Sequence, residues 1–180
     1  LISQQKEYLK LDDVITLFND YFSTGLLKVV GQNIKYDIEL LAKYGVKIKD
    51  VHFDTMIAAW LIDSNSAQYS LDDLASKYLA YDTIHFDDIV KKGEDFSYVD
   101  LDNALSYSAE DSDLTYRLYK YFDTLLVEKD LKKVFEEYEL PLIDVLVDME
   151  KEGVLLDKEF MAQLDERLSK KLDELTAQIH

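Results

Sequence analysis

Most of the chain carries apolar residues at helical spacing, interrupted by a few glycines. An amphipathic pattern predicts a helix over Leu11–Phe22, which Gly25 ends. The apolar run 26–30 predicts a short buried strand. A second helical pattern covers 33–44, and Gly45 is placed to close it. The N-terminal quarter therefore predicts helix, strand and helix in that order.

The remainder of the chain is predicted to be chiefly helical. The elements expected there are a helix over 55–62 capped by Asp54, a helix from Ser70 with Asp73 in a capping-box position, a looser stretch over 81–100, a long helix over 100–128, a segment opened by Pro141, and a charged helix from 158 to the end. We place a domain boundary near residue 130, which divides the chain into 1–130 and 131–180.

Asp37 occupies an unusual place on its predicted helix. At about 100° per residue it lies within about 60° of both Ile34 and Leu41, so it belongs to the inward-facing stripe. Its neighbour Glu39 has a lysine four residues away on either side, which is a solvent-side arrangement. Asp37 has no such partner, so its carboxylate needs another explanation.

The long helix repeats this pattern at Asp111. Asp111 lies on the stripe predicted to face the core, and Tyr107 projects a phenol from the same face four residues earlier. Asp113, in contrast, can reach Arg117 one turn later. The other members of the predicted core stripe are Ala104, Ser108, Thr115, Leu118 and Phe122.

A carboxylate that is buried without a partner is costly. Three explanations remain open for Asp37 and Asp111 at this point. Each carboxylate pairs with a lysine or arginine that is distant in sequence, or caps another element, or ligates a hard cation such as Mg²⁺.

Composition narrows the class of protein. The chain has 180 residues, 48% of them hydrophobic, which is enough for one core and part of another. It has no cysteine, which excludes disulfides and thiolate metal sites. It shows neither a signal peptide nor an apolar run of about 20 residues, so we expect a cytoplasmic protein without a membrane span. Its first residue is Leu1, and we expect a piece of a longer protein.

The formal net charge is −17, from 37 acidic and 20 basic residues. Phosphate contacts normally use clustered Lys and Arg, so this charge opposes binding to a nucleic acid. A nucleic-acid function would need divalent cations to supply positive charge locally. The simplest interpretation of the charge alone is an acidic, well-solvated surface.

Two ordered motifs resemble a known family. The segment "GQNIKYDIELLAKYG" resembles the second motif of the proofreading 3′–5′ exonuclease domain of bacterial DNA polymerase I, and "YSAEDSD" resembles its third motif, Tyr-x-x-x-Asp. This is the DEDD exonuclease superfamily, tyrosine subtype. "FDTMIAAWLID" and "SLDDLASKYL" also look like that domain, and "EYELPLIDVLVDMEKEGVLLD" resembles the start of a family A polymerase region.

The resemblance implies a fold, a cofactor and roles for residues. The implied fold class is α/β, a ribonuclease H-like exonuclease fold that is truncated and helix-rich, followed by the first polymerase helices. The implied cofactor is a pair of Mg²⁺ or Mn²⁺ ions, and the implied partners are a single-stranded 3′ end of DNA and the remainder of the polymerase chain. The roles implied are Asp37 and Asp111 as metal ligands, Tyr107 as the hydroxyl that orients the attacking water, Gln32 and Asn33 as residues lining the strand near the scissile phosphate, and Phe86 as an aromatic that packs on the terminal base.

Simpler interpretations of the lesser members stay open. Phe86 could be a core residue, and Asn33 could be no more than the N-cap of its helix. Asp54 already has a cap role, so we leave it out of the site.

The first motif of the family, an Asp-x-Glu on a strand, has no counterpart before residue 28. We therefore expect the chain to begin after that motif and to be nearly or wholly inactive by itself, although the parent would be a proofreading polymerase. Loss of the first strands would expose a strand edge, which predicts self-association. The alternatives are a catalytically silent exonuclease-like scaffold of a polymerase, and an acidic helical interaction module. The Asp-x-Glu triples present are Asp37-Ile38-Glu39, Asp148-Met149-Glu150 and Asp157-Lys158-Glu159.

Overall fold

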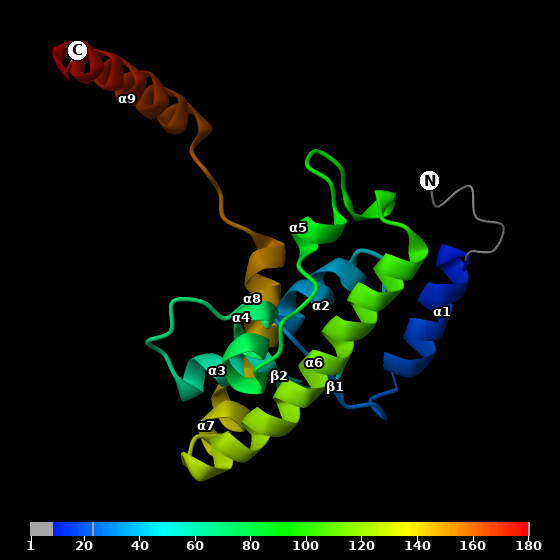
Figure 1. Ribbon diagram of the computed structural model, residues 1–180. Coiled ribbons are helices and arrows are strands. Elements are labelled where there is room, and N and C mark those ends of the chain that lie inside the picture. Colours follow the sequence, from blue (N-terminus) through cyan, green and yellow to red (C-terminus); the bar gives the residue numbers. More distant parts are fainter. Residues whose placement is uncertain (1–8, 23, 180) are drawn as a thin grey trace. The chain divides into compact units, whose positions relative to one another are not determined.

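The computed structural model describes residues 9–22 and 24–179. Contacts between residues divide the chain into two units, which meet at Val147 and Asp148. Figure 1 shows the elements in chain order. Each unit is described by itself below.

The elements of the first unit are chiefly helical. In order they are α1 (Leu11–Phe22), β1 (Val29–Gly31), α2 (Ile34–Ala42), β2 (Val51–Asp54), α3 (Thr55–Ile62), α4 (Leu71–Leu74) continued by a π turn (Ala75–Leu79), α5 (Phe86–Ile89), a 3₁₀ turn (Phe96–Tyr98), α6 (Leu101–Glu128), α7 (Lys132–Val134), a second π turn (Phe135–Glu139) and α8 (Leu140–Glu152). The expected α/β, helix-rich class is confirmed.

The two strands pair in parallel and form the sheet that the described residues contain. Val30 lies opposite Phe53 and Gly31 opposite Asp54, with an irregularity between Val29 and Val30. α2 is the crossover that connects the strands, as a parallel pair requires. The carboxyl ends of β1 and β2 therefore lie side by side, and both open toward the same end of the sheet.

The strand prediction over 26–30 was wrong in its bounds, because the strand begins at Val29 and includes Gly31. Leu26 is 84% exposed, so the first part of the apolar run is not buried. β2 was not predicted at all. Its sequence, Val-His-Phe-Asp, is short and half polar, and it gives only a weak strand pattern.

The predicted helix ends are largely confirmed. Asp100 caps α6 by accepting from the Asn103 backbone N–H, and Ser70 caps α4 in the same way. Gly45 has a φ of 77°, and the Val46 N–H donates to the Leu41 carbonyl at 3.1 Å. This is a Schellman ending, in which a residue with positive φ turns the chain out of α2.

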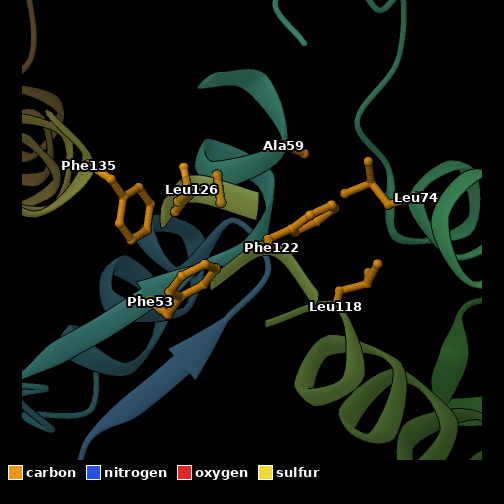
Figure 2. Close-up of a cluster of buried hydrophobic side chains, with 8 residues drawn as sticks. Phe53, Ala59, Leu74, Leu118, Phe122, Leu126 and Phe135 are labelled. Carbon is orange, nitrogen blue, oxygen red and sulfur yellow. The ribbon is translucent and has the colours of Figure 1, made fainter. Parts of the chain in front are cut away.

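The core of the first unit lies where the C-terminal half of α6 packs against α3, α4 and β2 (Figures 1 and 2). The phenyl rings of Phe53 and Phe135 are 4.7 Å apart between centroids, and α6 contributes a buried row at every fourth residue. The buried cluster is Phe53, Ala58, Ala59, Leu74, Leu118, Phe122, Leu126 and Phe135.

This core occupies only part of the stripe predicted on α6. Leu118 and Phe122 are fully buried, as expected, whereas Ser108 is exposed and Ala104 only half-buried. The N-terminal half of α6 is thus not packed into the core, and near its end Asp111 and Ser112 border a cavity. Small and polar residues occupy that half, which is consistent with an open face.

The helix that contains Pro141 begins before the proline. The Leu140 N–H donates to the Phe135 carbonyl five residues earlier, which closes a π turn directly before Pro141. Proline has no N–H, and its ring collides with the preceding turn of a regular helix, so a wider turn accommodates it. Pro141 is therefore the second residue of α8, and the expectation that it opens a new segment was wrong.

The second unit contains the last residues of α8 and the helix α9 (Lys158–Ile179). α9 confirms the predicted charged helix, and its described side chains are almost all exposed. Lys171 and Glu174 form an ion pair of 3.7 Å on its surface. The domain boundary near residue 130 stays a prediction.

Across the part of the chain that the structure describes, no helix is both long enough and apolar enough to cross a bilayer.

Candidate functional site

A cavity of about 520 Å³ lies between the end of β1, the first turn of α2 and the N-terminal half of α6. Asp37 and Asp111, which are 74 positions apart in the sequence, both line it, and Gln32 lines it beside them. The structure thus brings together three of the residues singled out from the sequence. The complete lining is Val30, Gln32, Asp37, Leu71, Asp111, Ser112, Thr115 and Tyr116.

The turn from β1 into α2 sets the position of Asp37. Gly31 ends the strand, and a Cβ placed on it would lie 2.5 Å from Cδ1 and 2.8 Å from Cβ of Ile34. Only a residue without a side chain permits this approach. Asn33 then takes a left-handed conformation (φ 56°), and α2 begins at Ile34. Asp37 follows within the first turn of α2, beside the end of the strand.

Asp37 is exposed at the cavity wall, and its partial desolvation there raises the pKa of its carboxyl above the usual value. A backbone hydrogen bond lowers this pKa, and the charge of Asp54 raises it further. Among the described residues, no lysine or arginine forms an ion pair with Asp37. A positive charge would therefore be stabilised at this position.

Asp111 is in a similar environment on α6. Burial raises the pKa of its carboxyl, and the charges of Asp72 and Glu110 raise it further. Within the described part of the chain, no lysine or arginine forms an ion pair with Asp111 either. Asp113, in contrast, pairs with Arg117 at 3.5 Å, as predicted. Of the three explanations for the two carboxylates, pairing with a distant lysine or arginine is contradicted.

Asp54 shows what a capping aspartate looks like. Its Oδ1 accepts from the backbone N–H groups of Met56 and Ile57 at 2.8 and 3.0 Å, and its Oδ2 accepts from the Ile34 N–H at 2.7 Å. One carboxylate thus caps α3, as predicted, and also caps α2. Asn33 is the N-cap residue of α2, as the simpler interpretation expected, but its side chain makes no capping hydrogen bond.

Gln32 is held in place from both ends of its amide. Its Nε2 donates to the Tyr69 carbonyl at 2.8 Å, and its Oε1 accepts from the Thr55 hydroxyl. The Gly31 carbonyl lies 3.2 Å from the same hydroxyl and shares its single proton with Gln32. The amide is therefore rigidly placed at the cavity wall. Asn33, predicted to lie beside it, does not line the cavity.

Tyr107 and Phe86 lie outside the cavity lining and belong to an aromatic cluster next to it. The ring of Tyr107 is 6.4 Å from that of Phe86 and 5.7 Å from that of Phe96, between centroids. Phe86 is 46% exposed, which excludes a simple core role. Burial raises the pKa of the Tyr107 hydroxyl, and the charge of Asp111 raises it further, so the phenol stays protonated.

The loop that carries Phe86 is fastened at two points. The Glu110 carboxylate accepts from the Ile84 N–H at 2.8 Å and from the Tyr81 hydroxyl at 2.9 Å. His85 Nδ1 lies 3.1 Å from Asp72 Oδ2, which connects the loop to α4. Sequence reasoning missed Glu110 and Asp72, because their partners are distant in the chain.

The cavity provides two carboxylates and an amide for a ligand. The described residues contain no group of three or more His, Asp or Glu side chains placed to hold a metal ion. Two carboxylates are nevertheless a common number for Mg²⁺, which keeps several waters and takes further oxygens from a substrate phosphate.

Comparison with known proteins identifies the family. A family model described as the 3′–5′ exonuclease of DNA polymerase A matches residues 4–127, which is more than half of the chain. This chain belongs to that exonuclease family. The resemblance derived from the two motifs is thereby confirmed, and the alternative of an acidic helical module without nuclease ancestry is wrong.

The relatives of this exonuclease chain include bacterial DNA polymerases I. It is 42% identical to DNA polymerase I of Borreliella burgdorferi over 87% of this chain, and 39% identical to DNA polymerase I of Treponema pallidum over 79% of it. The chain spans only 17% and 14% of the lengths of these two relatives. The chain therefore matches only a small part of each of these polymerases.

A solved structure supports the fold. The POL domain of Pol1 from M. smegmatis, in complex with DNA primer-template and dNTP, superposes with a TM-score of 0.71. The match covers 94% of this chain and 27% of that one at 20% identity. At this identity the similarity establishes the exonuclease fold alone.

Proposed function

We propose that this chain supplies the carboxylate pair of a metal-dependent 3′–5′ exonuclease site within a DNA polymerase I. The parent would remove mispaired 3′-terminal nucleotides by phosphodiester hydrolysis, and it would synthesise DNA with its other domains. The observation that carries the proposal is the convergence of Asp37 and Asp111 on one cavity, each with a raised pKa and neither with a cationic partner.

The donor set suits a hard divalent cation. Carboxylate oxygens are preferred by Mg²⁺ and Mn²⁺, and a cation would relieve the cost of burying two charges. When bound, a pair of such ions would activate a water and stabilise the leaving 3′ oxygen. Asp37 on α2 and Asp111 on α6 are the residues that would hold the ions. The ions would also supply the positive charge that a chain of net charge −17 otherwise lacks.

The remaining residues have roles toward the substrate. Tyr107 keeps its proton, so its hydroxyl would orient the attacking water. The fixed amide of Gln32 would contact the strand near the scissile phosphate, with Asn33 next to it at the start of α2. Phe86 is exposed and would pack on the terminal base, a contact that tolerates any base.

We also propose that the 180 residues by themselves hydrolyse DNA very slowly or not at all. Two carboxylates can retain one weakly held ion, whereas a two-metal site needs more ligands. A rival proposal is that the parent also lacks exonuclease activity and uses this domain as a scaffold. An Asp-x-Glu upstream of this segment in the parent, within a strand pattern, would argue against the rival.

Paramagnetic Mn²⁺ tests the carboxylate pair directly. We expect Mn²⁺ to broaden the amide NMR signals of residues that line the cavity, and Asp37→Asn or Asp111→Asn to remove this broadening. Asp113→Asn is the matched control, because Asp113 lies on the same helix and is well exposed. Broadening that persists unchanged in both cavity variants would contradict the proposal.

A nuclease assay tests the second claim. A 3′-labelled single strand incubated with this chain and Mg²⁺ or Mn²⁺ should remain intact over hours. Robust trimming that disappears in Asp111→Ala would show that two carboxylates suffice.

The partners we propose are a single-stranded 3′ end of DNA and the remainder of the polymerase chain. In the isolated chain, β1 pairs on one edge with β2, and we propose that its other edge pairs with a second copy. Light scattering that shows a strict monomer at high concentration would contradict self-association.

A further inference from the structure

A second cavity, of about 670 Å³, lies on the other flank of α6. We call it the tyrosine–lysine groove, after Tyr116, Lys120 and Tyr121, which line it together with Arg117. At about 100° per residue, Arg117 lies about 120° around the helix axis from Asp111. The groove is therefore separate from the carboxylate cavity, and the proposed function leaves it without a role.

The groove concentrates positive charge on a chain of net charge −17. Lys120 forms no ion pair within the described residues, and its Nζ lies 6.0 Å from the ring centroid of Tyr116. Arg117 lies over the ring of Tyr81 at 5.4 Å and pairs with Asp113 at 3.5 Å on an exposed surface. The carboxylate that lines the groove is that of Glu128. The groove thus offers an anion one cation that has no ion-pair partner in the described part of the chain, Lys120, and a second cation, Arg117, that would have to be shared with Asp113.

Aromatic rings accompany these cations. Tyr116 is 56% exposed and Tyr121 is 43% exposed, although phenol rings of this size usually bury more of their surface. Exposed rings next to Lys and Arg are the combination that binds single-stranded nucleic acid, because bases stack on the rings and phosphates meet the cations. An acidic peptide would use the cations but would leave the rings without a matching partner.

Tyr116 connects the two cavities, since it lines both of them. At about 100° per residue, Tyr116 lies about 140° from Asp111 and about 100° from Arg117, on the exposed side of α6. A strand whose 3′ end reaches the carboxylates could therefore cross α6 over this ring and continue into the groove.

We propose that the tyrosine–lysine groove is a second binding site for single-stranded nucleic acid, which holds nucleotides upstream of the 3′ end. Lys120 and Arg117 contact backbone phosphates, and Tyr121 and Tyr116 stack on bases. The proposal rests on the proposed function in one respect, because the strand is taken to extend from the carboxylate cavity. Binding in the groove itself needs neither a metal ion nor hydrolysis.

Fluorescence anisotropy of the 180-residue chain with a labelled oligothymidylate of about ten nucleotides, in EDTA, tests this site. We expect Lys120→Ala and Arg117→Ala each to weaken binding about five-fold at low salt. Each should also reduce the slope of log affinity against log salt by about 0.7, the value for one phosphate contact on a single strand. Tyr121→Leu should weaken binding about five-fold and leave the slope unchanged.

Matched controls lie on the same unit, away from the groove. Lys133→Ala removes a lysine that is 77% exposed, and Tyr138→Leu removes a tyrosine that is 65% exposed. Both should change the affinity less than two-fold. Equal losses in control and groove variants, or no binding by the unaltered chain in EDTA, would overturn the proposal. Competition by oligoglutamate as strong as that by the oligonucleotide would overturn it too, because the groove would then take an acidic peptide.

The same experiment separates this proposal from the proposed function. Asp37→Asn and Asp111→Asn should abolish Mn²⁺ broadening and should not weaken binding in EDTA, since removing negative charge does not repel a polyanion. If these two variants lose Mn²⁺ broadening but bind the oligonucleotide normally in EDTA, both proposals are supported. If the unaltered chain shows Mn²⁺ broadening but the groove variants bind the oligonucleotide as tightly as the unaltered chain does, the carboxylate proposal is retained and the groove proposal is overturned.

Discussion

The first turn of α2 and the start of α3 each hold an aspartate with a raised pKa, and the two differ in what surrounds the carboxylate: Asp54 is buried, whereas Asp37 is exposed at a cavity wall. Desolvation raises the pKa of both Asp37 and Asp54. Asp54 accepts three backbone N–H groups from two helices, whereas Asp37 faces a cavity. A raised pKa therefore does not by itself distinguish a structural acid from one that is free to bind a cation. The hydrogen-bond donors around the carboxylate make that distinction.

The largest effect is expected for Asp54→Ala. The change leaves the backbone N–H groups of Ile34, Met56 and Ile57 without an acceptor in a buried place, so we expect a loss of about 2–4 kcal/mol in the free energy of unfolding. Urea unfolding followed by circular dichroism measures it. Asp50→Ala, at an exposed position, should change stability by less than about 0.5 kcal/mol. A similarly small loss for Asp54→Ala would remove the contrast between the two aspartates.

Replacing the cavity carboxylates should have the opposite sign. Asp37→Asn and Asp111→Asn keep the size of the side chain and remove an unpaired charge, so we expect stability to be unchanged or raised by about 0.5 kcal/mol in the metal-free chain. The same urea titration in EDTA measures this. A loss larger than about 1 kcal/mol at either position would indicate a structural role like that of Asp54.

The pH dependence gives a smaller and sharper test. The pKa of Asp37 is raised in the folded chain, so the folded state holds its proton more tightly than the unfolded state does. Wild-type stability relative to Asp37→Asn is therefore greatest below the unfolded pKa of 3.8, and it falls as the pH rises through the folded pKa. Parallel urea titrations between pH 4 and neutrality check the sign, because any advantage of the variant should shrink as the pH is lowered. An advantage that grew on acidification would mean that the pKa of Asp37 is lowered in the fold.

The smallest effect concerns Asp72. Burial is the largest cause of the raised pKa of Asp111, and the charge of Asp72 is the second. A hydrogen bond to Asp72 also raises the pKa of His85 above 6.5, whereas burial lowers that of His52 below 6.5. In Asp72→Asn we expect the pKa of His85 to fall toward 6.5, that of Asp111 to fall, and that of His52 to stay unchanged. NMR titration reports all three. An unchanged pKa of Asp111 would show that burial alone raises it.

The features that sequence predicted well are those that neighbouring residues decide. The caps at Asp100 and Gly45 and the length of α6 depend on residues within one turn. Helical periodicity also placed Asp37 and Asp111 on inward faces; both line the cavity, where Asp111 is half-buried and Asp37 is exposed. Periodicity could not show that the two faces meet, since 74 residues separate them; the resemblance to the exonuclease motifs supplied that expectation.

The features that sequence missed depend on contacts between distant segments. β2 is a strand because Val29–Gly31 pairs with it, and its own four residues carry little signal. The second cap made by Asp54 crosses 20 positions of sequence to Ile34. From the sequence, Glu110 is an ordinary acidic residue on a helix surface, yet its carboxylate accepts a hydrogen bond from the Ile84 N–H and so holds the loop. No local sequence pattern predicts such partners, because the residues around each side chain would be the same whichever distant segment it contacted.

Gly31 has a consequence that reaches beyond its own turn. The missing side chain allows the chain to leave the strand and enter α2 with Ile34 folded tightly against it. A single methyl group at residue 31 would collide with Ile34, so the start of α2 would have to shift. The carboxylate of Asp37 would shift with it, while Asp111 would stay fixed on α6. Gly31 thus helps to set the distance between the carboxylates of Asp37 and Asp111.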